Sequence, residues 1–259
     1  MQPTTQLIFE HPVSWYIQEM AKGRPIVSVL YGDGEFRVIR GAHTGSFYTH
    51  YRELVTPTMV EELSRPLRSP HPDYIFGTDP NLINYHLYQG GDKEAIIKIG
   101  REIEDSLKSL GAAGTVRWVD GVVWDTASRS GEFNELFHYL RKRRVVLVAN
   151  QRLINSLTFL RACVIEAIPN KNAFKIIDDL ERKLGHLRGD YVYLLCMGLG
   201  AIPLATRLHY HNPEGQFFDI GSAFDVFGGI GAERGWRNDL YSNRREYQRI
   251  IAKHLNGVR

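Results

Sequence analysis

Short apolar runs alternate along the chain with longer segments of helical periodicity, and few folds are compatible with that pattern. Residues 26–31 and 145–149 are nearly continuous apolar runs, as expected for strands that are covered on both faces. Residues 92–110 place apolar side chains such as Ile96 and Ile103 at roughly helical spacing. The alternation predicts an α/β fold: a single Rossmann-like domain with a mostly parallel sheet and helices on both faces.

The same criteria locate the other expected elements. Capping residues followed by proline, at Thr56-Pro57 and Asp79-Pro80, predict helix starts. Asp92 is predicted to cap the helix that Gly111 ends. Further strands are expected at 115–119, 163–168, 191–197 and 216–220, and further helices at 81–88, 133–143, 173–184, 201–208 and 236–255.

Composition excludes several classes of protein. The 259 residues are 43% hydrophobic and 24% charged, which rules out a disordered or collagen-like chain. Without a linker or repeat, one domain is predicted over 1–259, with its core at about 26–225 and a basic, aromatic helical segment at about 234–259. The two cysteines, Cys163 and Cys196, are expected to be buried, reduced thiols.

No secretory leader is recognised, and no apolar stretch approaches the roughly 20 residues that span a bilayer. We therefore expect a cytoplasmic protein without membrane insertion. The formal net charge of +3 permits a polyanionic partner but does not require one.

Several predicted strands end in small or polar residues. Such ends occur at 32–35, 150–151, 169–172, 198–200 and 219–221. In an open parallel sheet, ligands bind beyond the carboxyl ends of the strands. We therefore expect these segments to meet at one cleft.

The triplet Asp33-Gly34-Glu35 is the most specific of these ends. Two carboxylates just past a buried strand can turn toward one cation, and hard oxygen ligands suit Mg²⁺ or Mn²⁺. The alternative is an ordinary turn with exposed charges.

Two later strand ends carry further candidates. Gly198 and Gly200 precede a predicted helix, so its N-terminus either binds a phosphate or sugar or simply follows a tight turn. Pro203 stands where a dinucleotide fingerprint needs glycine or alanine, which argues against a Rossmann dinucleotide site. Asp219 and Asp225 are candidate general bases, or else caps of the following turn.

Histidines and arginines supply two weaker patterns. His209 and His211 resemble a metal pair, but no further Cys or His lies nearby in sequence, so solvated surface histidines are expected. Near the C-terminus, basic and aromatic residues interleave, which is typical of nucleic-acid contact or of an amphipathic helix packed on the domain. The candidate acceptor or nucleic-acid contacts are Arg234, Trp236, Arg237, Arg244 and Arg245.

Taken in order, these segments resemble the GT-D glycosyltransferases. Members of that family open with a strand that leads into Gly-Asp-Gly-Glu, here residues 32–35, and close with Asp-Ile-Gly, here 219–221. Between them lie an apolar strand with a small, polar end, a turn with proline and asparagine, and a glycine-containing strand end, here 145–152, 168–173 and 197–200. The match extends over roughly residues 26–225.

The resemblance implies a nucleotide-sugar-dependent transferase of the GT-D fold. Asp33 and Glu35 would hold Mn²⁺ or Mg²⁺, directly or through water, against the diphosphate of a UDP-sugar. Asp219, with Asp225 as a second acid, would deprotonate or orient the acceptor hydroxyl. The donor-binding residues implied are Gly32, Gly34, Asn150, Asn170, Asn172, Gly198 and Gly200.

This chain departs from the family pattern at two positions. Tyr31 replaces a frequent arginine, and Ser222 replaces a frequent histidine, which leaves the role of each open.

The acceptor is open between two classes. The first is a 5-hydroxymethylpyrimidine in double-stranded DNA, glucosylated from UDP-glucose by an enzyme of the kind that phages carry into a bacterial host. The second is a glycan or glycoprotein. A non-catalytic nucleic-acid-binding module is the alternative from another class of function.

Overall fold

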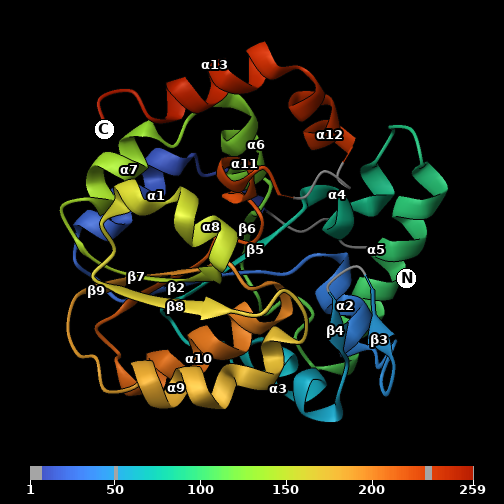
Figure 1. Ribbon diagram of the computed structural model, residues 1–259. Helices are drawn as coiled ribbons and strands as arrows, with labels where there is room; N and C mark the ends of the chain where they lie inside the picture. Colours follow the sequence, from blue (N-terminus) through green and yellow to red (C-terminus); the bar gives the residue numbers. More distant parts are fainter. Residues whose placement is uncertain (1–7, 50–51, 231–234, 259) are drawn as a thin grey trace.

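The computed structural model describes residues 8–49, 52–230 and 235–258 (Figure 1). Within them, one eight-stranded sheet has the order β1-β6-β5-β2-β10-β9-β7-β8, and its pairings are all parallel. Its strands are β1 Ile8–Phe9, β2 Ile26–Leu30, β5 Tyr74–Thr78, β6 Trp118–Asp120, β7 Arg144–Asn150, β8 Val164–Ile168, β9 Tyr191–Leu195 and β10 Gln216–Asp219. A short antiparallel pair, β3 Phe47–Tyr48 and β4 Glu53–Leu54, lies apart from this sheet.

Helices cover both faces of the sheet (Figure 1). One face carries α2 Asp33–Ile39, α3 Pro57–Arg68, α4 Pro80–Ile83, α5 Lys93–Ser109, α9 Ile177–Leu184 and α10 Ala201–His211. The other carries α1 Val13–Ala21, α6 Val123–Ser130, α7 Asn134–Leu140 and α8 Gln151–Ser156. The predicted α/β class, with a parallel sheet between two helical layers, is confirmed. Within the described ranges, the helices include none with the length and apolar character needed to cross a membrane.

Strand β7 illustrates why the core was readable from the sequence. Val146 and Val148 pack with the α9–α10 layer, whereas Val145, Leu147 and Ala149 pack with the α7–α8 layer. Successive side chains of a strand point to opposite faces, so a strand covered on both faces must be apolar throughout. Burying each valine or leucine contributes roughly 1.5–3 kcal/mol.

Most predicted strands and helices are present within a few residues of their expected bounds. Thr56 Oγ1 accepts a hydrogen bond from Met59 N (3.2 Å), and Asp79 Oδ1 accepts one from Asn81 N (2.9 Å), as expected for helix caps. The predicted cap at Asp92 is wrong, because its backbone is left-handed (φ 47°) and its side chain makes no capping bond. The expected C-terminal helix is divided at Asn243 into α12 Gly235–Ser242 and α13 Arg244–His254.

Several elements were not expected. Strand β5 contains Gly77 and Thr78 and is too short to show a clear period. Helices α1 and α6 were missed as well, and α2 occupies the segment that the sequence suggested was a turn. Gly34 in the first turn of α2 lowers the local helix propensity, so much of the stability of this helix comes from tertiary packing.

The expectation of two buried thiols is wrong for Cys163. Cys196 is buried after β9, but Cys163 is exposed just before the edge strand β8, where Sγ donates a hydrogen bond to Val145 O (3.2 Å). An edge strand has only one neighbour in the sheet, so residues beside it are less covered than those of a central strand.

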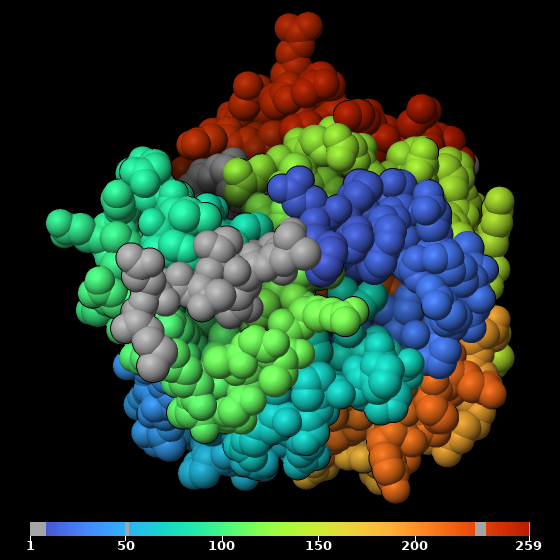
Figure 2. Space-filling view, turned by 180° about the vertical axis from the view of Figure 1, so that it is seen from behind, coloured from blue at the N-terminus to red at the C-terminus, as the bar shows by residue number. Residues whose placement is uncertain are grey.

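The C-terminal helices form a layer along the top of the molecule (Figure 2). Tyr241 donates from its hydroxyl to Ile230 O (2.7 Å), and Tyr247 donates to Val226 O (2.9 Å). Both rings pack on a small cluster with Leu240 and Ile250. Tyr241 and Tyr247 therefore serve packing, as the amphipathic-helix alternative predicts.

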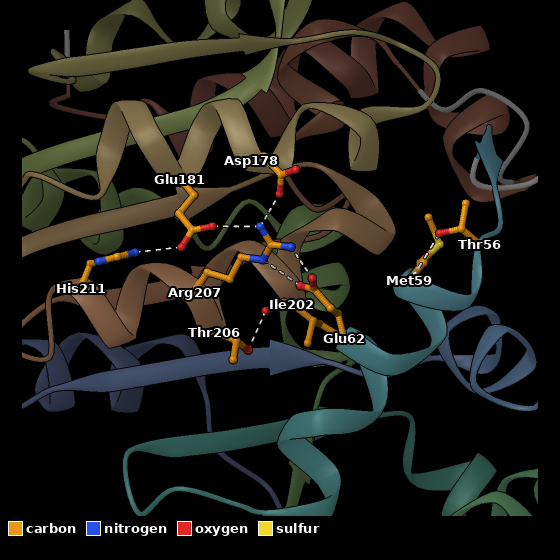
Figure 3. Close-up of polar contacts among 9 residues, drawn as sticks. All are labelled: Thr56, Met59, Glu62, Asp178, Glu181, Ile202, Thr206, Arg207 and His211. Carbon is orange, nitrogen blue, oxygen red and sulfur yellow. Dashed lines mark hydrogen bonds and ion pairs between the residues drawn. The ribbon is translucent and has the colours of Figure 1, made fainter.

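Arg207 joins three helices of one layer (Figure 3). From α10, it donates from Nε to Glu62 on α3 (2.9 Å) and from Nη1 to Asp178 (2.6 Å) and Glu181 (2.9 Å) on α9. Glu181 also contacts His211 (2.8 Å). The Glu62 side chain is only 6% exposed, and the Arg207 guanidinium is its ion-pair partner.

We expect Arg207→Met to lower the free energy of unfolding by about 2 kcal/mol, because it removes charged hydrogen bonds and leaves Glu62 buried without its partner. Urea denaturation followed by circular dichroism measures the change. Arg182→Met is the matched control, since the Arg182 side chain is 74% exposed and pairs only at the surface. Equal effects of the two substitutions would contradict the stabilising role of the network.

Candidate active site

The centre of the sheet contains a topological switch point. Strands β2 and β10 are parallel neighbours, with Phe218 beside Ser28. After β2 the chain enters α2, whose Phe36 packs in one core layer, whereas after β10 Phe224 packs in the other. When the segments that follow two adjacent strands leave toward opposite faces, a crevice opens at the carboxyl ends of those strands.

The Asp33-Gly34-Glu35 triplet forms the first turn of α2 rather than a loop. Glu35 is 6% exposed, and its Oε2 accepts a hydrogen bond from Gly32 N (2.8 Å). The side chain of Asp33 is 41% exposed and pairs with Arg37 (3.5 Å). Residues two apart on a helix do not face each other, so the two carboxylates have different surroundings.

Asp219 closes the other side of the switch point. It is 4% exposed, and its Oδ1 accepts from Gly221 N (2.8 Å) while its Oδ2 accepts from Leu30 N (3.3 Å). The carboxyl thus bridges the ends of β10 and β2. Burial and the nearby charge of Glu35 raise the pKa of Asp219 to about 8.

The Glu35–Asp219 pair fits a divalent cation better than the Asp33–Glu35 pair does. In the described part of the chain, no basic side chain forms an ion pair with Asp219. A buried carboxyl whose pKa is raised by a neighbouring carboxylate is an arrangement that a bound cation relieves, and carboxylate oxygens suit Mg²⁺ or Mn²⁺. The sequence placed Asp219 in a different role and did not predict this pairing.

We expect Asp219→Asn to flatten the dependence of stability on pH. The pKa of Asp219 in the fold, about 8, lies above that of an unfolded aspartate, so folding takes up a proton between about pH 4 and 8 and wild-type stability falls as pH rises through that window. Between pH 6 and 7 the free energy of unfolding of the wild type should fall by up to about 1.4 kcal/mol relative to that of Asp219→Asn.

Urea denaturation at each pH in the presence of a chelator measures this difference, and contributions from other titrating groups cancel in the comparison. Parallel pH profiles for the two proteins would show that Asp219 ionises normally.

The predicted donor-binding asparagines contribute to local structure. Asn150 Oδ1 accepts from Leu153 N (3.0 Å) and caps α8, and Asn172 Oδ1 accepts from Leu54 N (2.8 Å) and holds β4. Asn170 is exposed. Strands β7 and β8 are the third and fourth neighbours of β2, roughly 14 and 19 Å away at the usual spacing. These residues share an edge with the carboxyl pair without adjoining it.

The glycines after β9 lie nearer to the pair. Gly198–Gly200 form a 3₁₀ turn ahead of α10, and Gly198 is exposed with a left-handed φ of 56°. The N-terminus of α10 is therefore at the same edge of the sheet, where its free N–H groups favour an anion.

Asp225 pairs with the buried side chain of Arg237. Arg237 is fully buried, and its Nη1 lies 3.3 Å from Asp225 Oδ2. Its Nη2 lies 3.9 Å from Asp125 Oδ1 and donates to Ser222 Oγ (3.2 Å). The prediction that Arg237 contacts a nucleic acid is wrong, because its side chain is buried and its guanidinium binds Asp225 and Ser222.

Arg244 and Arg245 are exposed on α13, where they are able to meet a partner. Arg234 and the side chain of Trp236 lie outside the described residues. The two departures from the family pattern also have structural roles here. Tyr31 is buried and donates to Leu63 O (2.8 Å), and Ser222 anchors Arg237.

Sequence reasoning missed Asp120, at the end of β6. Burial raises the pKa of Asp120, and the charge of Asp79 adds to the effect. Its Oδ1 accepts from Val122 N (2.7 Å). An acidic residue followed by Gly121 at a strand end was the available signal, but the predicted strand stopped one residue earlier.

A surface groove of about 720 Å³ adjoins this region between α2 and α5. It is lined by Arg37, Arg40, Gly41, Ala42, His43, Ala95, Lys98, Ile99 and Glu102. Neither Glu35 nor Asp219 lines it, so the candidate site is defined by the chemistry of the strand ends rather than by this hollow.

Neither a protein-family model nor a curated protein matches the chain. Among solved structures, two of the domain of unknown function 1792 are similar, one of them described as having a distinct glycosyltransferase fold. Each has a TM-score of 0.60 and 17% identity, and the matches cover 83% and 85% of this chain and 79% and 81% of theirs. A third, described as a new glycosyltransferase (DUF1792) from Streptococcus sanguinis, has a TM-score of 0.53 and 14% identity over 85% of each chain. The protein therefore shares the fold of these domains.

Proposed function

We propose that the protein is a glycosyltransferase that moves a sugar from a nucleotide-sugar donor to an acceptor hydroxyl. The observation that carries this proposal is the buried Glu35–Asp219 pair at the β2–β10 switch point. The shared fold with domains described as glycosyltransferases supports the reaction class. A UDP-sugar, with glucose as the first sugar to test, is the proposed donor.

Glu35 and Asp219 would hold Mn²⁺ or Mg²⁺, with Asp33 contacting it through water. When bound, the ion offsets the negative charge that develops on the leaving nucleoside diphosphate. The Gly198–Gly200 turn and the N-terminus of α10 offer N–H groups to the donor. The backbone N–H groups of Leu30 and Gly221 orient the Asp219 carboxyl.

Burial and the nearby charge of Glu35 favour the protonated form of Asp219 below its pKa of about 8, and positive charge at the site would favour the carboxylate. This makes a role as general base conditional on donor and cation binding, because burial otherwise keeps the carboxyl neutral near pH 7. Asp225 is a poorer candidate for the general base, since Arg237 pairs with its carboxylate. We assign Asp225 to the support of the site rather than to proton transfer.

A glycan or glycoprotein is the proposed acceptor class. The burial of Arg237 removes one of the predicted nucleic-acid contacts, and the nearby Tyr241 and Tyr247 are engaged in packing within the fold. DNA stays the second candidate because Arg244 and Arg245 are exposed next to each other. If DNA is the acceptor, Arg244→Ala/Arg245→Ala should weaken DNA binding and reduce its salt dependence.

Titration calorimetry with UDP-glucose, in the presence and absence of Mn²⁺, tests the proposal. Wild type should bind only with the metal, and Glu35→Gln should bind at least about tenfold more weakly. Glu61→Gln is the matched control, since Glu61 is a half-exposed carboxylate on α3 that pairs with Arg68. If no nucleotide sugar binds with or without metal, the transferase proposal fails and a non-catalytic binding module becomes the better explanation.

A further inference from the structure

A second cluster of potential metal ligands lies at the opposite edge of the sheet. His71 and Asp73 precede β5, and His209 is in the last turn of α10. Because α10 begins at the carboxyl ends of the strands and runs back, its last turn reaches their amino ends. The cluster is therefore separate from Glu35 and Asp219.

The three side chains converge on one point. Asp73 Oδ2 lies 3.2 Å from His209 Nε2 and 3.4 Å from His71 Nδ1. The potential ligand atoms of all three residues lie within 4.8 Å of one another. Nitrogen and oxygen ligands about 2.0–2.1 Å from a tetrahedral metal are about 3.4 Å apart, so the separations of Asp73 Oδ2 from the two ring nitrogens match those expected around a shared ion.

His209 contradicts the expectation of a solvated surface histidine. It is only 8% exposed, and its ring packs edge-on against Tyr74 and Phe217, with centroids 6.0 and 5.9 Å away. Its Nδ1 is buried, and no hydrogen-bond partner for it is present among the described residues. Packing rather than a second hydrogen bond thus aims Nε2 at Asp73.

The cluster is open to solvent on the side of His71. Its side chain is 56% exposed, and its ring lies edge-on to that of His209, with centroids 5.2 Å apart. The backbone N–H of Asp73 donates to His71 Nδ1 at 3.3 Å, a long bond that a metal ion at Nδ1 would replace.

We propose that His71, Asp73 and His209 bind a divalent transition-metal ion, with Zn²⁺ as the reference ligand. Two imidazoles and one carboxylate favour Zn²⁺, Co²⁺ or Ni²⁺ over Mg²⁺, which prefers oxygen ligands. Three protein ligands leave a fourth position for water. The bound ion would join the turn before β5 to the end of α10 and so stabilise the amino-terminal edge of the sheet.

Titration of the chelator-treated full chain with Zn²⁺ and with Co²⁺ tests this site. The Glu35→Gln protein, which lacks the other proposed cation site, should bind one ion per chain, show the visible absorption of four- or five-coordinate Co²⁺, and melt at a higher temperature with Zn²⁺. His71→Ala changes an exposed side chain and should fold normally, yet it should bind at least about tenfold more weakly and lose the Co²⁺ bands.

His186→Ala, at an exposed histidine on the segment after α9, is the matched control and should behave as wild type. Glu35→Gln should also retain the site, so loss of the proposed transferase activity and loss of this site are distinguishable. Absence of Zn²⁺ binding by wild type, or full binding by His71→Ala, would overturn the assignment and leave a hydrogen-bonded His–Asp–His cluster.

Discussion

Glu35→Gln should reduce sugar transfer by about 10²–10⁴-fold while leaving the fold intact. The amide oxygen of Gln can still accept the hydrogen bond from Gly32 N, so the start of α2 is preserved. What is lost is the negative charge beside Asp219, which the proposed cation requires. A loss of this size is typical when one charged group is removed from a buried catalytic site.

Release of UDP from UDP-glucose, measured at saturating Mn²⁺ over a range of donor concentrations, separates kcat from KM. Circular dichroism and the urea midpoint establish that the variant is folded. Glu61→Gln should retain wild-type rates. A Glu35→Gln protein with wild-type kcat and KM would exclude Glu35 from the site, whatever the nature of the acceptor.

Arg237→Met should lower the free energy of unfolding by about 3–5 kcal/mol. The substitution keeps the length and packing of the side chain but leaves Asp225 and Asp125 without the guanidinium that lies between them. Removing one partner of a largely buried ion pair costs more than the pair itself contributes, because the remaining carboxylates, 17% and 23% exposed, stay mostly out of water. The effect should exceed that of Arg207→Met, since Arg237 is fully buried whereas Arg207 is 18% exposed.

Urea denaturation of Arg237→Met and of Arg244→Met measures this difference. Arg244 is exposed on α13, so its loss should change stability by no more than about 0.5 kcal/mol. The same pair tests the acceptor assignment, because only Arg244 is placed to contact a polyanion. Equal stabilities for the two variants would mean that Arg237 is not needed inside the fold.

Much of the architecture was predictable because burial on both faces leaves a direct pattern in the sequence. The β7 run from Val145 to Ala149 could only be a central strand, and its apolar side chains do pack in both layers. Strand β5 and helix α2 escaped detection because their local sequences are weak. Gly77 and Gly34 are poor formers of strand and helix, and neighbouring elements stabilise both segments.

The position of the candidate site in the sheet was predictable, but the pairing of Glu35 with Asp219 was not. A parallel sheet brings all its carboxyl ends to one edge, so the predicted strand ends had to share that edge. Which side chains meet there depends on sheet order, and the sequence contains no local signal that β10 lies beside β2. For the same reason His209 was assigned to solvent, because its partner Asp73 is distant in sequence.

The class of fold, the edge of the sheet that carries the candidate site and the acidic residues available there were predictable from the sequence, because strand periodicity and strand-end composition are local properties. That Glu35 lies near Asp219, that Arg237 is internal, and that His71, Asp73 and His209 converge follows only from the packing of the folded chain. Each of these depends on contacts between residues far apart in the chain. The raised pKa of Asp219, for example, comes mainly from desolvation, which occurs only once the neighbouring elements have packed.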